Sequence, residues 1–208
     1  MQTRNEMIVE PIGLNPDALP RPLDWASLFG NPNPVEMEIG MGKGTFITEA
    51  AKRRPEHNFF GIEWANWFWR YASDRLRRNH CTNARTARAD ASFFVKEFVP
   101  DASLAVLHVY FPDPWPKKRH NKRRLIQEPF LKEVDRILAP GGRLQVVTDH
   151  KDYFEQIDAV VKASKLTVVE YDRPGAAKEG EVVGTNFERK YIAQGRPFYA
   201  IAAVKAST

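Results

Sequence analysis

The apolar residues of this chain follow two alternating patterns. Short, nearly continuous apolar runs predict buried strands at residues 35–40, 58–63, 83–89, 104–110, 142–149, 166–171 and 197–205. Apolar positions at helical spacing predict helices at residues 45–54, 64–78, 124–138 and 151–165, with a shorter helix after Asp90. This alternation predicts an α/β, Rossmann-like fold with a mostly parallel seven-stranded sheet, and the last two strands predict a C-terminal antiparallel hairpin.

The first 34 residues depart from this alternation. Their prolines interrupt regular structure at Pro11, Pro16, Pro20, Pro22, Pro32 and Pro34. We therefore expect residues 1–34 to form an arm that wraps the rest of the protein, anchored by Trp25, Leu28 and Phe29. Residues 35–208 are expected to form one domain, with ample length for a hydrophobic core.

A glycine-rich turn follows the first predicted strand. Glu38 lies two residues before Gly40, and Gly42 and Gly44 lead into the helix that begins near Thr45. A strand, a glycine turn and a helix N-terminus form the nucleotide-binding corner of a doubly wound sheet. The dinucleotide fingerprint would need Gly or Ala where Thr45 stands. An acid beside the turn suits the ammonium of a methionine moiety better than a pyrophosphate, which predicts S-adenosylmethionine (AdoMet).

Two further acids follow later strands. Glu63 ends the second strand, 19 residues past Gly44, where a carboxylate can accept both ribose hydroxyls of a nucleoside. Asp90 follows the third strand, and it either binds the adenine amino group or caps the next helix. Trp64 is expected to border the adenine. The aromatic residues after it are expected to lie mostly in the core: Trp67, Phe68, Trp69 and Tyr71.

A proline-rich turn and a basic run follow the strand at residues 104–110. Alternating prolines from Pro112 to Pro116 stop that strand and place Asp113 and Trp115 on a rigid, extended turn. In open α/β sheets, ligands bind at this end of the strands. Six of the eight residues at 117–124 are Lys or Arg. An acid and a large ring beside dense positive charge predict a site for a polyanion, with a merely solvated charged face as the alternative.

Composition and charge fit a globular protein of the cytoplasm. Hydrophobic residues make up 43% and charged residues 27% of the chain, and the net charge of +5 is modest. No segment has the pattern of a signal peptide or the length of a membrane span. Cys81 is the single cysteine and the five histidines lack ligand spacing, so neither a disulfide nor a metal site is expected.

Over roughly residues 35–204, the chain resembles the bacterial tRNA (guanine-N7)-methyltransferases. The most specific element is the sequence P-D-P-W-P-K-K-R-H-N-K-R-R at Pro112–Arg124. Shorter matches occur in the same order at Glu38–Gly42, Gly61–Glu63, Thr148–Asp149 and Thr185–Glu188. The first segment is shorter than in some members, so arm-dependent tRNA contacts are not expected to carry over.

The resemblance implies a class I methyltransferase that transfers the methyl group of AdoMet to N7 of guanine 46, in the variable loop of tRNA. It implies AdoMet contacts from Glu38, Glu63, Asp90 and Asp113, alongside the glycines Gly40, Gly42 and Gly44. Guanine and tRNA contacts are implied at Lys117, Asp149, Thr185, Asn186, Phe187 and Glu188. Contacts along the tRNA backbone are implied at Arg119, His120, Asn121, Lys122, Arg123 and Arg124. The enzyme would act as a monomer or a homodimer.

The chemistry of guanine N7 agrees with these residue types. N7 carries a neutral lone pair, so no proton has to be removed before it attacks a methyl group. The protein must then only position the reactants and stabilise charge that develops on the purine. Asp113, on its proline-braced turn, is the expected catalytic residue for that task, and it need not act as a base.

Three other classes of protein are alternatives. The P-D-P-W sequence is similar to the D-P-P-Y/W loop of methyltransferases that act on the exocyclic amines of flipped bases. A non-enzymatic RNA-binding module would explain the basic run, but it would not need Glu38, Glu63 and the glycine turn together. A nicotinamide dehydrogenase is disfavoured by Thr45. Binding of AdoMet and mapping of the methylated base separate these classes.

Overall fold

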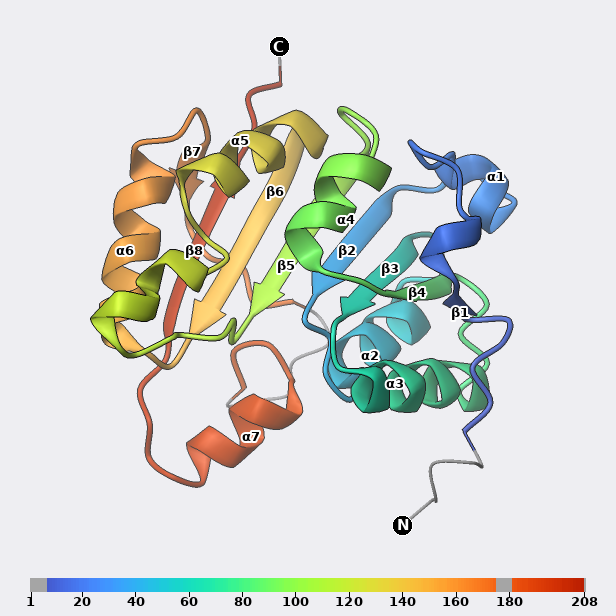
Figure 1. Ribbon diagram of the computed structural model, residues 1–208, viewed down its shortest axis with the longest axis horizontal. Coiled ribbons are helices and arrows are strands. Elements are labelled where there is room, and N and C mark those ends of the chain that lie inside the picture. Colours follow the sequence, from blue (N-terminus) through green and yellow to red (C-terminus); the bar gives the residue numbers. More distant parts are fainter. Residues whose placement is uncertain (1–6, 175–180, 208) are drawn as a thin grey trace.

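A single sheet forms the centre of the molecule (Figure 1), in a computed structural model that describes residues 7–174 and 181–207, without the side chain of Phe187. Its strands are β1 (Gly13–Leu14), β2 (Val35–Ile39), β3 (Asn58–Glu63), β4 (Ala84–Arg88), β5 (Leu104–Tyr110), β6 (Leu138–Thr148), β7 (Thr167–Val169) and β8 (Tyr199–Val204). They lie in the order β1-β4-β3-β2-β5-β6-β8-β7. The first six strands pair in parallel, and β8 pairs antiparallel with both β6 and β7.

Helices cover both faces of the sheet. They are α1 (Trp25–Phe29), α2 (Thr45–Arg53), α3 (Asn66–Arg78), α4 (Ala91–Phe98), α5 (Glu128–Ile137), α6 (Lys151–Lys162) and α7 (Asn186–Ile192), with 3₁₀ turns η1 (Pro16–Ala18) and η2 (Lys118–Arg123). Neighbouring residues of β3 serve opposite faces, because side chains alternate along a strand. Phe60 packs into the cluster that contains Phe94 of α4, whereas Phe59 packs into the cluster that contains Phe46 of α2.

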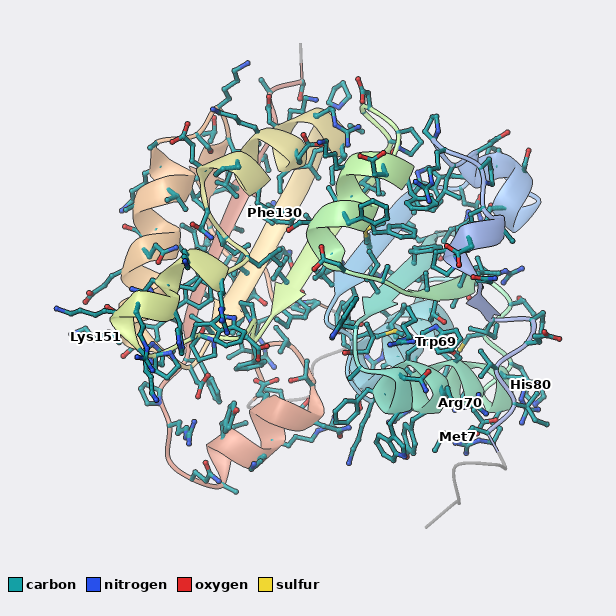
Figure 2. The ribbon with its side chains drawn as sticks, in the orientation of Figure 1. Met7, Trp69, Arg70, His80, Phe130 and Lys151 are labelled. Carbon is teal, nitrogen blue, oxygen red and sulfur yellow. The ribbon has the colours of Figure 1, made fainter. Side chains whose placement is uncertain are left out.

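The structure confirms the α/β, Rossmann-like fold and the C-terminal antiparallel pair, but corrects the number of strands. The sheet has eight strands rather than seven, because the first segment supplies β1, which pairs with β4 through Gly13 and Thr86. Trp25 is buried in the main core and Leu28 packs against it, as predicted. Figure 2 shows Met7 beside Arg70, whose Nη2 donates to the Met7 carbonyl at 3.2 Å.

Two helical predictions are wrong. The helix predicted at residues 124–138 begins only at Glu128, and Pro129 lies in its first turn, where proline is tolerated. The aromatic residues of α3 lie largely outside the core: Trp67, Phe68, Trp69 and Tyr71 are half-buried, and Trp64 before the helix is 66% exposed. The face of α3 that packs on the sheet instead carries the buried residues Ala72, Ser73 and Leu76.

A chain of buried polar side chains crosses the central strands. The carboxylate of Glu36 on β2 pairs with His108 Nε2 of β5 at 2.8 Å, and it also binds Arg54. His108 Nδ1 lies 2.7 Å from the Tyr110 hydroxyl, which donates to Gln145 Oε1 of β6 at 3.0 Å. Burial lowers the pKa of His108 despite the bond to Glu36. This chain fixes Tyr110, which lines the cleft described next.

Within the described ranges, no helix is long and apolar enough to cross a membrane. The same residues contain no group of three or more His, Cys, Asp or Glu side chains placed to hold a metal ion.

Candidate cofactor and RNA site

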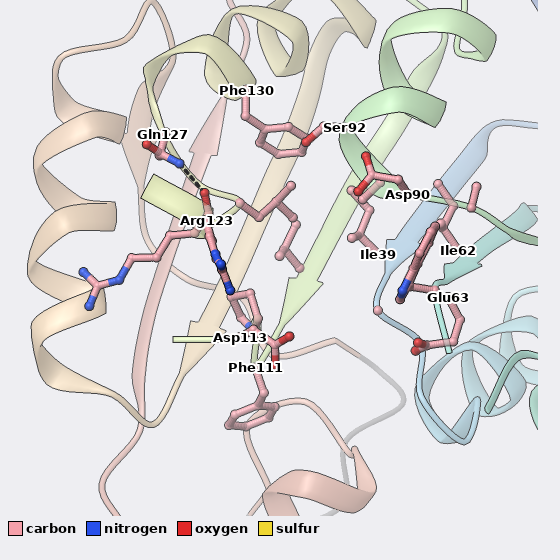
Figure 3. Close-up of a pocket in the computed structure, with 18 of the residues that line it drawn as sticks. Ile39, Ile62, Glu63, Asp90, Ser92, Phe111, Asp113, Arg123, Gln127 and Phe130 are labelled. Carbon is pink, nitrogen blue, oxygen red and sulfur yellow. Dashed lines mark hydrogen bonds between the residues drawn. The ribbon is translucent and has the colours of Figure 1, made fainter. Parts of the chain in front are cut away.

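A cleft of 1090 Å³ opens at the carboxyl ends of the central strands. It lies where the strand order reverses, between β2 and β5, which is the usual ligand position in such sheets. Figure 3 shows Glu63 and Asp90 on one side of this cleft and Asp113, Phe111 and Arg123 on the other. The structure thus brings together acids that are far apart in the sequence.

The glycine turn after β2 forms the floor of the cleft. Gly40 has a φ of +74°, and a Cβ there would meet nothing within 4 Å, so its backbone faces open space in the cleft. Gly44 is required for a steric reason, because a Cβ added there would lie 2.8 Å from Ala72 Cβ of α3. Glu63 braces the turn, because its carboxylate accepts from Gly42 N at 2.9 Å and from Ala65 N at 2.8 Å. Each oxygen keeps a further lone pair for a ligand hydroxyl.

Glu38 supplies a buried acid beside this turn. It is 4% exposed, and its Oε2 has no hydrogen-bond partner among the described residues. Burial raises the pKa of Glu38 to about 8, and the charge of Glu63 adds to this rise. Glu38 lines a second cavity of 250 Å³, together with Asn186 and Lys190. A buried carboxylate oxygen without a partner fits the ammonium group of AdoMet, which would supply the missing hydrogen bond.

The raised pKa of Glu38 predicts a pH-dependent stability in the cofactor-free protein. The folded protein holds this proton more tightly than the unfolded chain, so the contribution of the neutral form is lost as pH rises from 4.5 to about 8. Glu38→Gln stays neutral and should raise the free energy of unfolding at pH 8 by about 2–4 kcal/mol, with little change at pH 4.5. Urea unfolding across this pH range measures the difference, and parallel curves for the two proteins would contradict it.

The proline-rich turn carries Asp113 at the opposite wall of the cleft. The sequence predicted an extended turn. The turn is not fully extended, because Phe111 and Trp115 adopt left-handed φ values of 52° and 42°. Phe111 N donates to Val147 O of β6 at 2.7 Å, which fixes the start of the turn. The Arg123 guanidinium lies 4.8 Å from the centre of the Trp115 ring and holds that ring against η2.

The basic run forms η2 and presents most of its charge to solvent. Exposed cationic residues are Lys117, Lys118, Arg119, Lys122 and Arg123, whereas His120 and Asn121 are half-buried. Lys122 and Arg123 also line the cleft, so positive charge continues from the open surface to the wall that carries Asp113. This continuity favours the anion-binding interpretation of the run over a merely solvated face.

Comparisons with known proteins identify the family. Residues 32–201 match the model of a family described as putative methyltransferases. A tRNA (guanine-N7)-methyltransferase of Rhodopirellula baltica is 39% identical over 92% of this chain and 73% of its own length. One from Geobacillus thermodenitrificans is 37% identical over 97% of this chain and 94% of its own length. The chain belongs to the tRNA (guanine-N7)-methyltransferase family.

Solved structures with the same fold are more distant in sequence. The 16S rRNA methyltransferase KamB superposes with a TM-score of 0.60 at 14% identity, over 84% of this chain and 88% of that chain. An A1408 methyltransferase from an uncultured bacterium superposes with a TM-score of 0.57 at 17% identity, over 88% of this chain and 94% of that chain. At these identities the likeness concerns the fold, which is that of Rossmann-like methyltransferases.

Residues at the start of α7 place part of the predicted substrate site at the smaller cavity. Thr185 and Asn186 line that cavity, and the Thr185 hydroxyl accepts from Glu188 N at 3.0 Å. Glu188 is fully buried, and its carboxylate accepts from Val183 N at 3.0 Å and from Gly184 N at 2.6 Å. In this conformation Glu188 organises the loop before α7. The side chain of Phe187 lies outside the described residues.

Three other residues predicted for the site do not line the small cavity. Asp149, at the end of β6, pairs with Arg196 at 2.7 Å. Lys117 is exposed and precedes η2. Asp90 lines the cleft while its Oδ1 caps α4 by accepting from Phe93 N at 2.9 Å, so the cap and a cofactor contact are compatible.

Arg124, a predicted RNA contact, is buried, and several residues that line the small cavity were not predicted. Arg124 is buried at 3% exposure, so its guanidinium is not available to a phosphate. The unpredicted residues of the small cavity include Phe68, Tyr110 and Lys190. Tyr110 could have been predicted from the sequence, because it is the last residue of the strand before the proline turn and so lies at the edge where ligands bind. Phe68 and Lys190 could not, since their places depend on how α3 and α7 pack.

Proposed function

We propose that this protein transfers the methyl group of AdoMet to N7 of guanine 46 in the variable loop of tRNA. One observation carries the proposal: Glu63 and Asp90, suited to AdoMet, face Asp113 and the basic run across one cleft. The membership of the chain in the tRNA (guanine-N7)-methyltransferase family supports the choice of substrate and atom.

The cofactor would be held by residues around the glycine turn. Glu38 would accept the ammonium group through its unpartnered Oε2, and Glu63 would accept the ribose hydroxyls. The backbone at Gly40 and Gly42, both in the cleft, allows close approach of the cofactor. Asp90 and the exposed ring of Trp64 would lie on the adenine side. AdoMet supplies an activated methyl group that needs no metal or enzymatic nucleophile.

The target guanine would enter between Asp113 and the small cavity at α7. Asp113 would orient the reacting groups and offset the positive charge that alkylation at N7 gives the purine. Lys117, Asp149, Thr185, Asn186 and Phe187 are the remaining candidates for contacts with guanine and nearby tRNA. Glu188 would act through the loop that holds Thr185, given its backbone partners.

The basic run would track the tRNA backbone through Arg119, His120, Asn121, Lys122 and Arg123. Phosphate contacts position a nucleic acid without reading its sequence, which fits side chains on an exposed 3₁₀ turn. All residues in this proposal come from one chain, so it applies equally to a monomer and to a homodimer.

The decisive test is incubation of the protein with methyl-labelled AdoMet and unmodified tRNA. Reduction and aniline cleavage of the product should report N7-methylguanosine at position 46 of the variable loop. A transcript with adenine at position 46 is the matched control and should accept no label. Label on an exocyclic amine would instead identify an amino-methyltransferase, and binding of tRNA without AdoMet binding would identify an RNA-binding module.

The basic run should set the salt dependence of tRNA binding. Replacing Arg119 and Lys122 with alanine removes two exposed cations, so the slope of log K against log salt should flatten by roughly 1.4–1.8. Affinity for AdoMet should stay unchanged. Lys162→Ala with Lys165→Ala is the matched control, because these lysines lie at the C-terminal end of α6 and just after it and are also exposed. Equal slopes for both double variants would show that the basic run is only a solvated charged face and does not contact tRNA.

A further inference from the structure

Arg124 differs from every cationic neighbour in the basic run. It is 3% exposed, whereas Lys122 and Arg123 beside it are exposed to solvent. A guanidinium removed from water is costly unless its donors are paired. The partners of Arg124 therefore indicate why the chain places a charge at this position.

Two elements share the guanidinium of Arg124. Its Nε donates to the carbonyl oxygen of Pro114 at 2.8 Å. Its other nitrogens bind α6, where Nη1 donates to Gln156 Oε1 at 2.8 Å and Nη2 pairs with Asp152. The Tyr153 ring lies 4.9 Å from the guanidinium carbon and covers its face. All three α6 partners lie within about one turn of that helix.

The carbonyl of Pro114 belongs to the residue directly after Asp113. Pro112, Pro114 and Pro116 have no backbone N–H, so the turn has few donors with which to fix itself. Its position therefore depends on what its carbonyls accept. The segment after Arg124 is held by the same helix, since Ile126 N donates to the Tyr153 hydroxyl at 2.9 Å. Gln156 Nε2 also donates to Ile126 O at 3.0 Å.

We infer that Arg124 is a positioning residue, which ties the turn carrying Asp113 to α6 and so sets Asp113 for methyl transfer. Arg124 makes no contact with tRNA phosphate in this arrangement, and its charge serves the turn. The inference rests on the proposed function for its catalytic consequence only. Its structural consequence, an ordered turn at residues 111–117, can be measured without any activity.

Arg124→Lys is the main test, because lysine keeps the charge but cannot span three acceptors with a planar fork. In single-turnover assays the rate of methyl transfer should fall by about 10- to 100-fold, the scale for small displacements of a reacting geometry. The Kd for tRNA and its salt slope should not change. Arg119→Ala is the matched comparison, because Arg119 is exposed and does not line the cleft, and it should weaken tRNA binding and flatten the slope by about 0.7–0.9. An unchanged rate of methyl transfer in Arg124→Lys would overturn the inference.

A second measurement does not depend on catalysis. Gln156→Leu removes one acceptor of the guanidinium and the donor to Ile126 O. Hydrogen exchange at the backbone amides of Phe111, Asp113, Trp115 and Lys117 should therefore quicken in both Arg124→Lys and Gln156→Leu. The double variant should resemble Arg124→Lys, because both changes break one network. Unchanged exchange in these variants would refute the positioning role even if wild-type protein methylates tRNA. If wild-type protein leaves tRNA unmethylated, the proposed function fails, while the exchange and tRNA-binding results still decide the role of Arg124.

Discussion

Replacing Asp113 with alanine is expected to lower kcat for tRNA methylation by at least about 100-fold, the usual size of losing one preorganised electrostatic group. Asp113 lies in the wall of the cleft across from Glu63 and Asp90, where methyl donor and guanine would meet. Asp113 is exposed, so the fold and most of the affinity for AdoMet should survive. Methyl transfer at saturating AdoMet, together with thermal unfolding, measures both parts of this prediction.

Asp113→Asn separates two ways in which the carboxylate could act. The amide has nearly the same shape and still accepts a hydrogen bond, but it carries no charge. If the charge offsets the developing positive purine, this variant should be as slow as Asp113→Ala. If orientation alone matters, it should recover most of the rate. An alanine variant with a near-normal rate would remove Asp113 from the mechanism.

Replacing Glu63 with alanine is expected to weaken AdoMet binding by about 1.5–3 kcal/mol, or roughly 10- to 150-fold in Kd. Two losses combine in this variant. The ribose hydroxyls lose a charged acceptor, and the amides of Gly42 and Ala65 lose the carboxylate that holds the glycine turn. Calorimetric titration of the cofactor measures the effect. Glu155→Ala, at an exposed acid on α6, is the control for loss of a negative charge.

Glu63→Gln refines this result. The glutamine oxygen can still accept from one backbone amide, but its amino group cannot accept a ribose hydroxyl. An affinity between those of wild type and Glu63→Ala would therefore support both roles of the carboxylate. An alanine variant that binds AdoMet as tightly as wild type would exclude Glu63 from the cofactor site.

The strands and the cleft were predictable because their signals are local in the sequence. An apolar run followed closely by an acid predicts both a buried strand and a polar group near its carboxyl end. Glu63 is the last residue of β3, and Asp113 lies three residues after the end of β5. Parallel pairing then brings these ends to one edge without any knowledge of the loops. The glycine turn was equally predictable, since Gly40 and Gly44 need positive φ values.

The missed features depend on contacts between distant elements. Nothing local distinguishes Arg124 from Arg123, and only the packing of α6 against residues 124–126 buries one and exposes the other. The aromatic residues of α3 are of the types usually found in a core, but Ala72 and Leu76 are the residues of that helix that pack on the sheet. Pairing between β1 and β4 likewise spans about 70 residues and involves only two register pairs.

The two residues of β1 also decide what the sheet offers to other molecules. Without them, β4 would be the outermost strand, with backbone groups such as the Thr86 amide, which now donates to Ile12 O at 2.9 Å, left unpaired. Open strand edges act as templates for pairing between copies of a chain and for aggregation. Gly13 suits this close packing, because a Cβ there would lie 2.1 Å from Val9 Cγ1 and the Val9 side chain would have to shift. The arm therefore contributes to colloidal solubility, and its loss would lower the yield of dispersed protein even where the cleft stayed intact.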